Sequence, residues 1–208
     1  SRLKTRLSLL REKEPFFAFV QTSGNHRPFT IPKDQRGFVV EPMDAQALKE
    51  NGFDSVAAYN GMRFLDYSLG FYFERARKAP YFKNTVFILY GDHGNPSTQQ
   101  TPFQELQLTG YHVPAVIYAP GLIKGGRRIE STASLTDALP TMLGILGVPY
   151  LNTGIGRDLL GLGPRDLRFS LVGDNAVLDD EFYLRVDPGG PRLFRYRDRK
   201  STRLNSSH

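Results

Sequence analysis

The stretch VFILYGDHGNP, residues 86–96, decides the fold prediction, because an apolar strand ends there in a polar pair between glycines. Residues 85–90, TVFILY, form the kind of continuous apolar run that is typical of a parallel strand covered on both faces. In open α/β sheets, ligands bind at the carboxyl ends of such strands, which is where Asp92 and His93 fall. A carboxylate beside an imidazole suits a divalent cation, although the same residues can form a plain polar turn.

A second histidine follows another predicted strand. Residues 15–20, PFFAFV, are apolar and aromatic, and the Gly-, Pro- and Asn-rich residues 21–38 after them read as a long loop that contains His26. If both strands are parallel neighbours, His26 projects from the same sheet edge as Asp92 and His93, which favours a shared site over a solvated loop histidine. Arg27 can bind an anion there, because a guanidinium matches phosphate geometry, although a surface arginine is the commoner case.

The remaining pattern alternates helices and strands. Apolar spacing predicts helices over residues 41–51, 54–79 and 135–146, a strand over 113–119, and an antiparallel hairpin of 181–186 with 192–197 around DPGG. His112 precedes the strand at 113, a position that more often serves packing than chemistry, and Asp137 reads as an acid at a helix start. The order indicates an α/β fold with a mostly parallel sheet flanked by helices and a C-terminal antiparallel hairpin.

Charge and composition exclude several classes of protein. Residues 191–208 contribute +5 of the net charge of +6, so the body of the chain is nearly neutral and offers no basic groove for nucleic acid. The absence of cysteine excludes disulfides and thiolate zinc sites within the chain. No run of about 18 apolar residues is present, and no P-loop, GxSxG or GxGxxG motif occurs.

Several segments together resemble the alkaline phosphatase/sulfatase superfamily. They are SGNHRPFTIP from residue 23, the stretch from FDSVAAYNG to ILYGDHG over residues 53–94, YHVPAVIYAPGL from residue 111, and SLTDALPTMLGILGVPYLNTGIGRDLLG from residue 134. NHRPF and GDHG are the specific parts, and they are most similar to the lipoteichoic acid synthase-like, phosphoglycerol transferase branch. The resemblance implies an alkaline phosphatase-like fold.

The resemblance also implies roles for individual residues. Asp92 and His93 match metal ligands, for manganese or magnesium in this branch and calcium in sulfatases. His26 matches a histidine that contacts the phosphate-bearing substrate, and His112 matches a position before a VP or IP strand. The implied reaction uses a metal-activated threonine and a covalent phospho-enzyme, then passes the group to an acceptor.

The matching nucleophile and an acidic metal ligand lie upstream of PFFAFV in the family. We therefore expect residues 1–162 to be a partial catalytic domain whose N-terminal portion is missing, residues 163–200 to be its β-rich extension, and residues 201–208 to be a non-native tail. On its own the chain should be soluble and inactive and should bind metal weakly. The parent protein should act on a phospholipid or phosphoglycerol-type substrate at the periplasmic face of a bacterial inner membrane, anchored by its missing part. A sulfatase and a non-catalytic binding domain are the alternatives.

Overall fold

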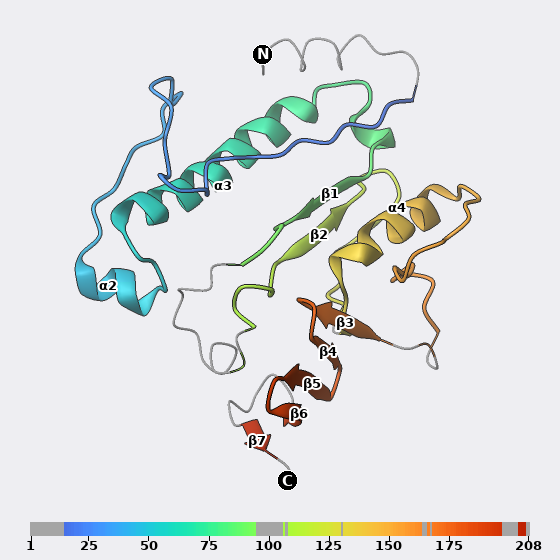
Figure 1. The fold of residues 1–208 in the computed structure, drawn as a ribbon. Helices are drawn as coiled ribbons and strands as arrows, with labels where there is room; N and C mark the ends of the chain where they lie inside the picture. The colour runs from blue at the N-terminus through green and yellow to red at the C-terminus, as the bar shows by residue number, and fades with distance from the viewer. Residues whose placement is uncertain are drawn as a thin grey trace. The chain divides into compact units, whose positions relative to one another are not determined.

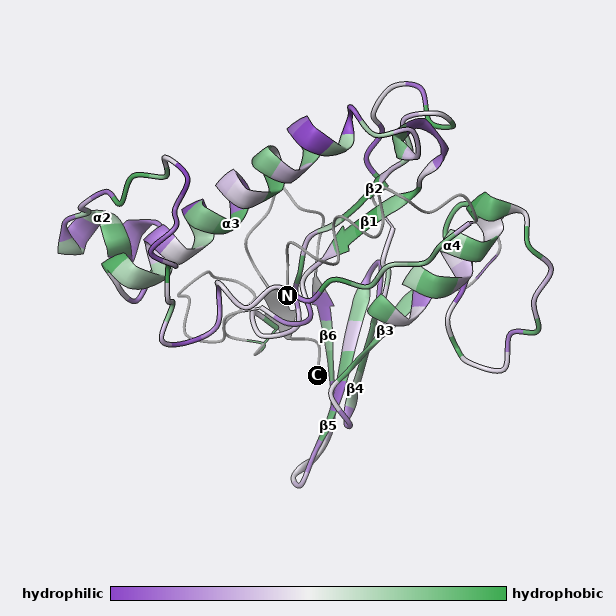
Figure 2. Cartoon of the chain, turned by 90° about the horizontal axis from the view of Figure 1, so that it is seen from above, coloured by the Kyte–Doolittle hydropathy of each residue, from purple (hydrophilic) through white to green (hydrophobic). Residues whose placement is uncertain are grey.

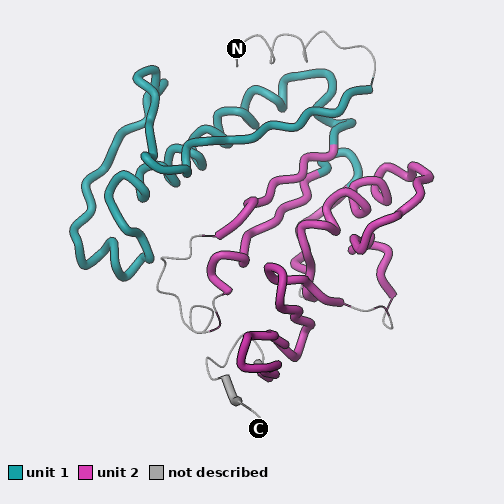
Figure 3. The backbone as a smooth tube through the Cα atoms, viewed as in Figure 1, with its two compact units in different colours: residues 1–85, 119–122 teal, residues 86–118, 123–208 magenta. Residues whose placement is uncertain are grey.

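The computed structural model describes residues 15–94, 106, 108–129, 131–163, 166, 168–196 and 204–206. These residues fall into two compact units, which Figure 3 distinguishes by colour. Unit 1 comprises residues 1–85 and 119–122, and unit 2 comprises residues 86–118 and 123–208. The expected tail, 201–208, falls in unit 2, and its residues 201–203, 207 and 208 lie outside the described part.

Unit 1 is built around a long helix. Its elements are α2 (Ala45–Glu50), α3 (Val56–Ala76) and the short 3-10 helix η1 (Phe82–Asn84) (Figure 1). The side chain of Asp44 accepts a hydrogen bond from the backbone of Ala47 at 2.9 Å, and that of Ser55 accepts one from Ala58 at 3.1 Å. Each cap satisfies an amide that the first helical turn leaves without a partner. The two helices predicted in this region are confirmed, with shorter bounds.

The predicted strand over residues 15–20 is wrong. The described backbone there has no strand partner, and Phe17, Phe19 and Val20 are 74%, 71% and 74% exposed. An apolar run reports that side chains favour burial, but it does not supply the neighbour that a strand must pair with. Residues 15–20 instead form an extended segment in which the ring of Phe16 meets Tyr81 edge to face, with 5.5 Å between centroids.

The prediction of a mostly parallel sheet is also wrong for the described residues. β1 (Phe87–Tyr90) pairs with β2 (Ala115–Tyr118) in an antiparallel, two-stranded sheet in which Phe87 lies opposite Tyr118. A parallel pair needs a crossover connection, usually a helix, and the described parts of the connection, 91–94, 106 and 108–114, contain only turns and extended backbone. Continuous apolar character, as in β1, indicates burial and leaves the direction of the partner strand open.

The helix predicted over residues 135–146 is confirmed as a 3-10 turn, η2 (Leu135–Asp137), followed by α4 (Ala138–Leu146). Pro140 sits in the first turn of α4, where its missing amide hydrogen costs no intrahelical bond. Gly147 ends the helix with a φ of 64°, in the left-handed region that glycine adopts without strain. Figure 2 shows that α4 is hydrophobic along most of its length.

Unit 2 ends in an antiparallel meander. Its strands are β3 (Phe169–Val172), β4 (Ala176–Asp179), β5 (Phe182–Asp187), β6 (Gly190–Tyr196) and β7 (Leu204–Ser206), in that spatial order. The predicted hairpin is confirmed as β5 and β6, which turn at the pair Asp187 and Gly190. Hydrogen bonds from Arg192 and Arg185 lower the pKa of the Asp187 carboxyl at this turn. β7 lies within the segment expected to be a tail and pairs with β6.

The meander buries part of the chain that returns from the GDHG stretch. Leu106 and Leu108 are 4% and 6% exposed, and they form one cluster with Val172 of β3 and Tyr183 of β5. The hydroxyl of Tyr183 also donates to the carbonyl oxygen of Leu106 at 3.4 Å, and burial raises the pKa of this phenol. The position of the chain just before His112 is therefore fixed by the C-terminal sheet.

Candidate metal and substrate-binding residues

The GDHG stretch leaves β1 as an exposed polar turn. Asp92 and His93 are both exposed, and Oδ1 of Asp92 accepts a hydrogen bond from the backbone amide of His93 at 3.0 Å. This contact holds the carboxylate against the turn and places two potential metal donors on adjacent residues. The prediction that both follow the end of a strand is confirmed, although the sheet that supplies the strand is antiparallel.

The two glycines of GDHG are required by close packing. Neither has a positive φ, so the expectation that they supply unusual backbone angles is wrong. A Cβ atom on Gly91 would lie 3.1 Å from Cγ1 of Val113, and one on Gly94 would lie 2.0 Å from the carbonyl oxygen of Thr109 and 3.0 Å from that of His112. Real Cβ atoms do not approach an oxygen so closely, so the returning chain can lie there only against glycine.

Hydrogen bonds join the same two segments. The amide of Gly94 donates to the carbonyl oxygen of Gly110 at 2.9 Å, and the amide of Gly91 donates to that of Pro114 at 3.3 Å. His112 ends this turn, with its amide bonded to the carbonyl oxygen of Leu108 at 3.0 Å. The structure therefore brings the backbone of His112 next to GDHG, a neighbourhood that spacing along the chain did not reveal.

The donor set fits half of a metal site. Carboxylate oxygen and imidazole nitrogen are ligands that Mn²⁺ and Mg²⁺ sites in proteins use, and Asp92 with His93 supplies one of each. Within the described ranges, no group of three or more His, Cys, Asp or Glu side chains could hold a metal ion. Asp92 and His93 therefore suit a site that other ligands complete.

His26 and Arg27 lie in unit 1, in a compact turn. The amide of His26 donates to the carbonyl oxygen of Ser23 at 3.2 Å, and that of Phe29 donates to the carbonyl oxygen of His26 at 2.8 Å. The Nδ1 atom of His26 lies 2.7 Å from the carbonyl oxygen of Arg27. Because a carbonyl only accepts, the ring carries its hydrogen on Nδ1 and leaves Nε2 for a ligand. That His26 shares a site with residues of unit 2 stays a prediction.

The Arg27 guanidinium projects from this turn. Its side chain is 72% exposed, and it forms an ion pair with Asp54, which immediately precedes the cap of α3, at 3.2 Å. The turn itself rests on α3, because the carbonyl oxygen of Gly24 would lie 3.1 Å from a Cβ atom on Gly61. The cation is thus oriented by a carboxylate and remains open to an anion.

Asp137 has a larger structural role than the sequence indicated. Its side chain is fully buried and accepts hydrogen bonds from the amide of Ser134 at 2.7 Å, from the amide of Arg157 at 2.8 Å, and from Nε and a terminal nitrogen of Arg157 at 3.1 and 2.8 Å. The same guanidinium donates to the carbonyl oxygen of Phe169 at 2.6 Å. The network fixes the start of α4 to the loop that precedes β3, and only the fold pairs residues twenty positions apart.

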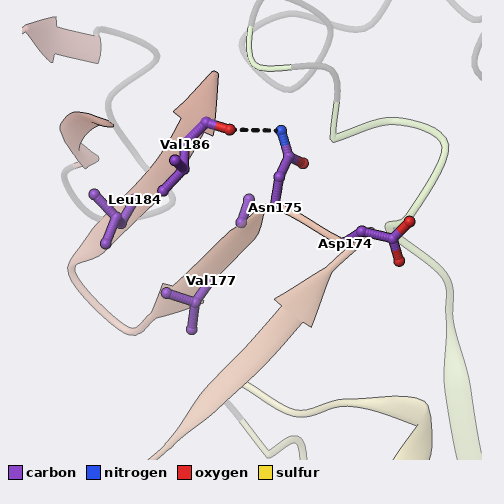
Figure 4. A pocket seen from close by; sticks show the side chains of 6 residues that line it. Asp174, Asn175, Val177, Leu184 and Val186 are labelled. Carbon is purple, nitrogen blue, oxygen red and sulfur yellow. Dashed lines mark hydrogen bonds between the residues drawn. The ribbon is translucent and has the colours of Figure 1, made fainter. Parts of the chain in front are cut away.

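A pocket in the meander contains none of the predicted site residues. It has a volume of about 360 Å³ and is lined by Asp174, Asn175, Ala176, Val177, Leu184 and Val186 (Figure 4). Asn175 spans it by donating from its amide to the carbonyl oxygen of Val186 at 3.0 Å. With one charged side chain in its lining, this pocket lacks the converging polar groups of a catalytic site.

Residues 3–148 match the sequence model of the family described as Sulfatase. The chain belongs to this family. Among curated relatives, the lipoteichoic acid synthase of Staphylococcus saprophyticus is 31% identical over 84% of this chain and 27% of its own length. Lipoteichoic acid synthase 1 of Bacillus subtilis is 30% identical over 68% of this chain and 23% of its own length. The chain thus spans about a quarter of the length of these relatives.

Solved structures agree on the fold. A protein of the alkaline phosphatase superfamily from Vibrio parahaemolyticus aligns with a TM-score of 0.72 and 25% identity, over 99% of this chain and 47% of that one. The lipoteichoic acid synthase LtaP from Listeria monocytogenes aligns with a TM-score of 0.62 and 18% identity, over 83% and 44%. This sulfatase-family chain therefore has an alkaline phosphatase-like fold. Among the helices that the structure describes, none combines the length and hydrophobicity that crossing a bilayer requires.

Proposed function

We propose that this chain is part of a metal-dependent phosphotransferase or phosphoesterase domain that acts on a phosphoglycerol-type lipid substrate. Asp92 and His93 are two ligands of Mn²⁺ or Mg²⁺, and His26, Arg27 and His112 bind the substrate. The observation that carries the proposal is the pair of exposed, adjacent donors at the end of β1 in a chain related to lipoteichoic acid synthases. The complete protein would work outside the cytoplasm, at the membrane surface that holds such a lipid.

The geometry of the turn supports the metal-binding role. The Asp92 carboxylate is held by the amide of His93 through Oδ1 alone, so acceptor capacity remains on both oxygens for a cation. A bound divalent cation would neutralise charge that develops on the phosphoryl oxygens and lower the pKa of an attacking hydroxyl. Two protein ligands give weak affinity, so further ligands and the nucleophile would come from polypeptide outside this chain.

The substrate-binding role follows from charge and hydrogen-bonding capacity. The Arg27 guanidinium, oriented by Asp54, can donate two parallel hydrogen bonds to a phosphate. His26 presents Nε2, which donates to a phosphoryl oxygen when the ring is protonated and passes that proton to a departing alcohol. The backbone neighbourhood of His112 and Gly94 supports a place for His112 beside the metal ligands.

The reaction consists of two displacements at phosphorus. A hydroxyl oxygen supplied from outside this chain attacks, the phosphorus–oxygen bond to the lipid alcohol breaks, and the alcohol leaves with a proton from an acid such as His26. An acceptor hydroxyl, or water, then attacks the phospho-enzyme, gives up its proton, and releases the original nucleophile. Transfer and hydrolysis differ only in the acceptor.

The test uses the complete polypeptide that carries this sequence. Asp92→Asn and His93→Gln should each lower Mn²⁺ content and turnover of a phosphoglycerol ester by at least about 100-fold, since ligand loss removes the cation as well as its geometry. Asp66→Asn, on the exposed side of α3, is the matched control and should change neither quantity. Wild-type metal content and turnover in both ligand variants would refute the proposal.

A second candidate, hydrolysis of sulfate esters, is favoured by the family match itself. Turnover of a sulfate ester by the complete polypeptide, with none of the corresponding phosphate ester, would select it. Wild-type Mn²⁺ binding that Asp92→Asn abolishes, without turnover of either ester, would instead indicate a binding domain on the same fold.

A further inference from the structure

The His93 ring contacts a backbone oxygen of its own turn. Its Nδ1 atom lies 2.9 Å from the carbonyl oxygen of Gly94. A carbonyl oxygen has no hydrogen to donate, so the ring nitrogen is the donor and carries the hydrogen. In the neutral ring the lone pair is then on Nε2. A free histidine in water can adopt either tautomer, and this contact selects one of them.

The carbonyl of Gly94 is held in place by the chain that returns to β2. The Gly94 amide donates to Gly110 at 2.9 Å, and the missing Cβ atom leaves space that the carbonyl oxygen of Thr109 fills. The turn at 108–112 is in turn fixed by Leu106 and Leu108, which are buried against β3 and β5. The direction of the Gly94 carbonyl thus depends on packing against the C-terminal sheet.

We infer that Gly94 is a positioning residue for the metal ligand: its carbonyl, locked by the 108–112 turn, holds His93 in the Nδ1–H tautomer and presents Nε2 to the cation. This inference rests on the proposed function. Histidines that bind metals usually donate their other ring N–H to a carbonyl or carboxylate, which fixes the ring and raises its basicity. The β3–β7 meander therefore contributes to the metal site indirectly, by anchoring the turn that holds Gly94 in place.

His26 provides an internal reference. Its Nδ1 contacts the carbonyl oxygen of Arg27 at 2.7 Å, so it should have the same tautomer, but it lies in unit 1. A change at Gly94 should therefore alter the tautomer of His93 and leave that of His26 unchanged. A merely structural disturbance of the whole chain would affect both rings.

The first experiment needs no substitution at Gly94. Ring ¹H–¹⁵N correlation spectra of the labelled 208-residue chain, recorded where the imidazoles are neutral, report directly which ring nitrogen is protonated. The variants His26→Gln, His93→Gln and His112→Gln assign the resonances. We expect His93 to be protonated at Nδ1. A His93 ring protonated at Nε2 overturns the inference.

The second experiment compares Gly94→Ala with Gly126→Ala, whose Cβ atom would meet nothing within 4 Å. Gly94→Ala should shift His93 towards the Nε2–H tautomer and raise the Mn²⁺ concentration that half-broadens its resonances by about 10–100-fold. Gly126→Ala should leave both readouts, and His26, unchanged. An unchanged His93 tautomer and Mn²⁺ response in a folded Gly94→Ala chain overturns the inference.

Failure of the proposed function has a different signature. If Mn²⁺ broadens no resonance of His93 in the wild-type chain while the ring stays protonated at Nδ1, the metal site is wrong and the tautomer assignment stands. If Mn²⁺ broadens His93 in a ring protonated at Nε2, the metal site stands and the role of Gly94 is wrong.

Discussion

Replacing Asp137 by alanine should be among the most damaging single changes in this chain. Asp137 is fully buried, and its carboxylate accepts four hydrogen bonds, from the amides of Ser134 and Arg157 and from two guanidinium nitrogens of Arg157. The substitution removes every acceptor at once. It leaves a guanidinium that is only 15% exposed without its counter-ion.

The expected cost follows from that burial. Removing one partner of a buried ion pair costs about 3–5 kcal/mol, because the remaining charge is neither paired nor hydrated. For a chain of this length, 1 kcal/mol corresponds to about 2–4 °C in melting temperature, so Asp137→Ala should melt roughly 6–20 °C below the wild type. Arg157→Ala should cost a similar amount, since it also loses the bond to Phe169.

Chemical and thermal denaturation followed by circular dichroism, as a double-mutant cycle, tests this reasoning. The double variant Asp137→Ala/Arg157→Ala should cost less than the sum of the two singles, because no unpaired charge remains buried. Asp34→Ala removes one partner of an exposed pair and should cost less than about 1 kcal/mol. A cost below about 1 kcal/mol for Asp137→Ala, or strictly additive effects, would refute the buried-pair account.

Three further outcomes follow from the packing. Gly156→Ala should destabilise the chain by about 1–3 kcal/mol, since its Cβ would lie 2.0 Å from the carbonyl oxygen of Thr136, whereas Gly154→Ala should be tolerated; equal melting temperatures would contradict this. Gly61→Ala should change backbone amide shifts throughout the NHRPF turn, because its Cβ would lie 3.1 Å from a backbone oxygen of that turn. Burial raises the pKa of Tyr72 from 10.0 to about 12, so the stability gained from its neutral phenol is complete below pH 10.0 and lost as the pH rises through about 12. Tyr72→Phe should remove the last step of the tyrosinate absorbance titration and flatten that alkaline loss.

Much of the candidate site was predictable, because its chemistry is local. GDHG and NHRPF name their own donors, and the end of β1 places Asp92 and His93 in an exposed turn as the apolar run before them required. The reason for the glycines was not predictable. It lies in the returning chain at 108–113, whose approach to GDHG depends on leucines buried in a sheet far along the sequence.

The sequence by itself determined the elements whose causes lie within a few residues. Caps at Asp44 and Ser55 begin the two helices of unit 1, and the DPGG turn closes the β5–β6 hairpin. Only the tertiary structure decided the antiparallel pairing of β1 with β2 and the burial of Asp137 against Arg157. Local propensity acts through neighbouring backbone atoms, whereas strand direction and the partner of a buried charge are fixed by residues that meet only after the chain has folded.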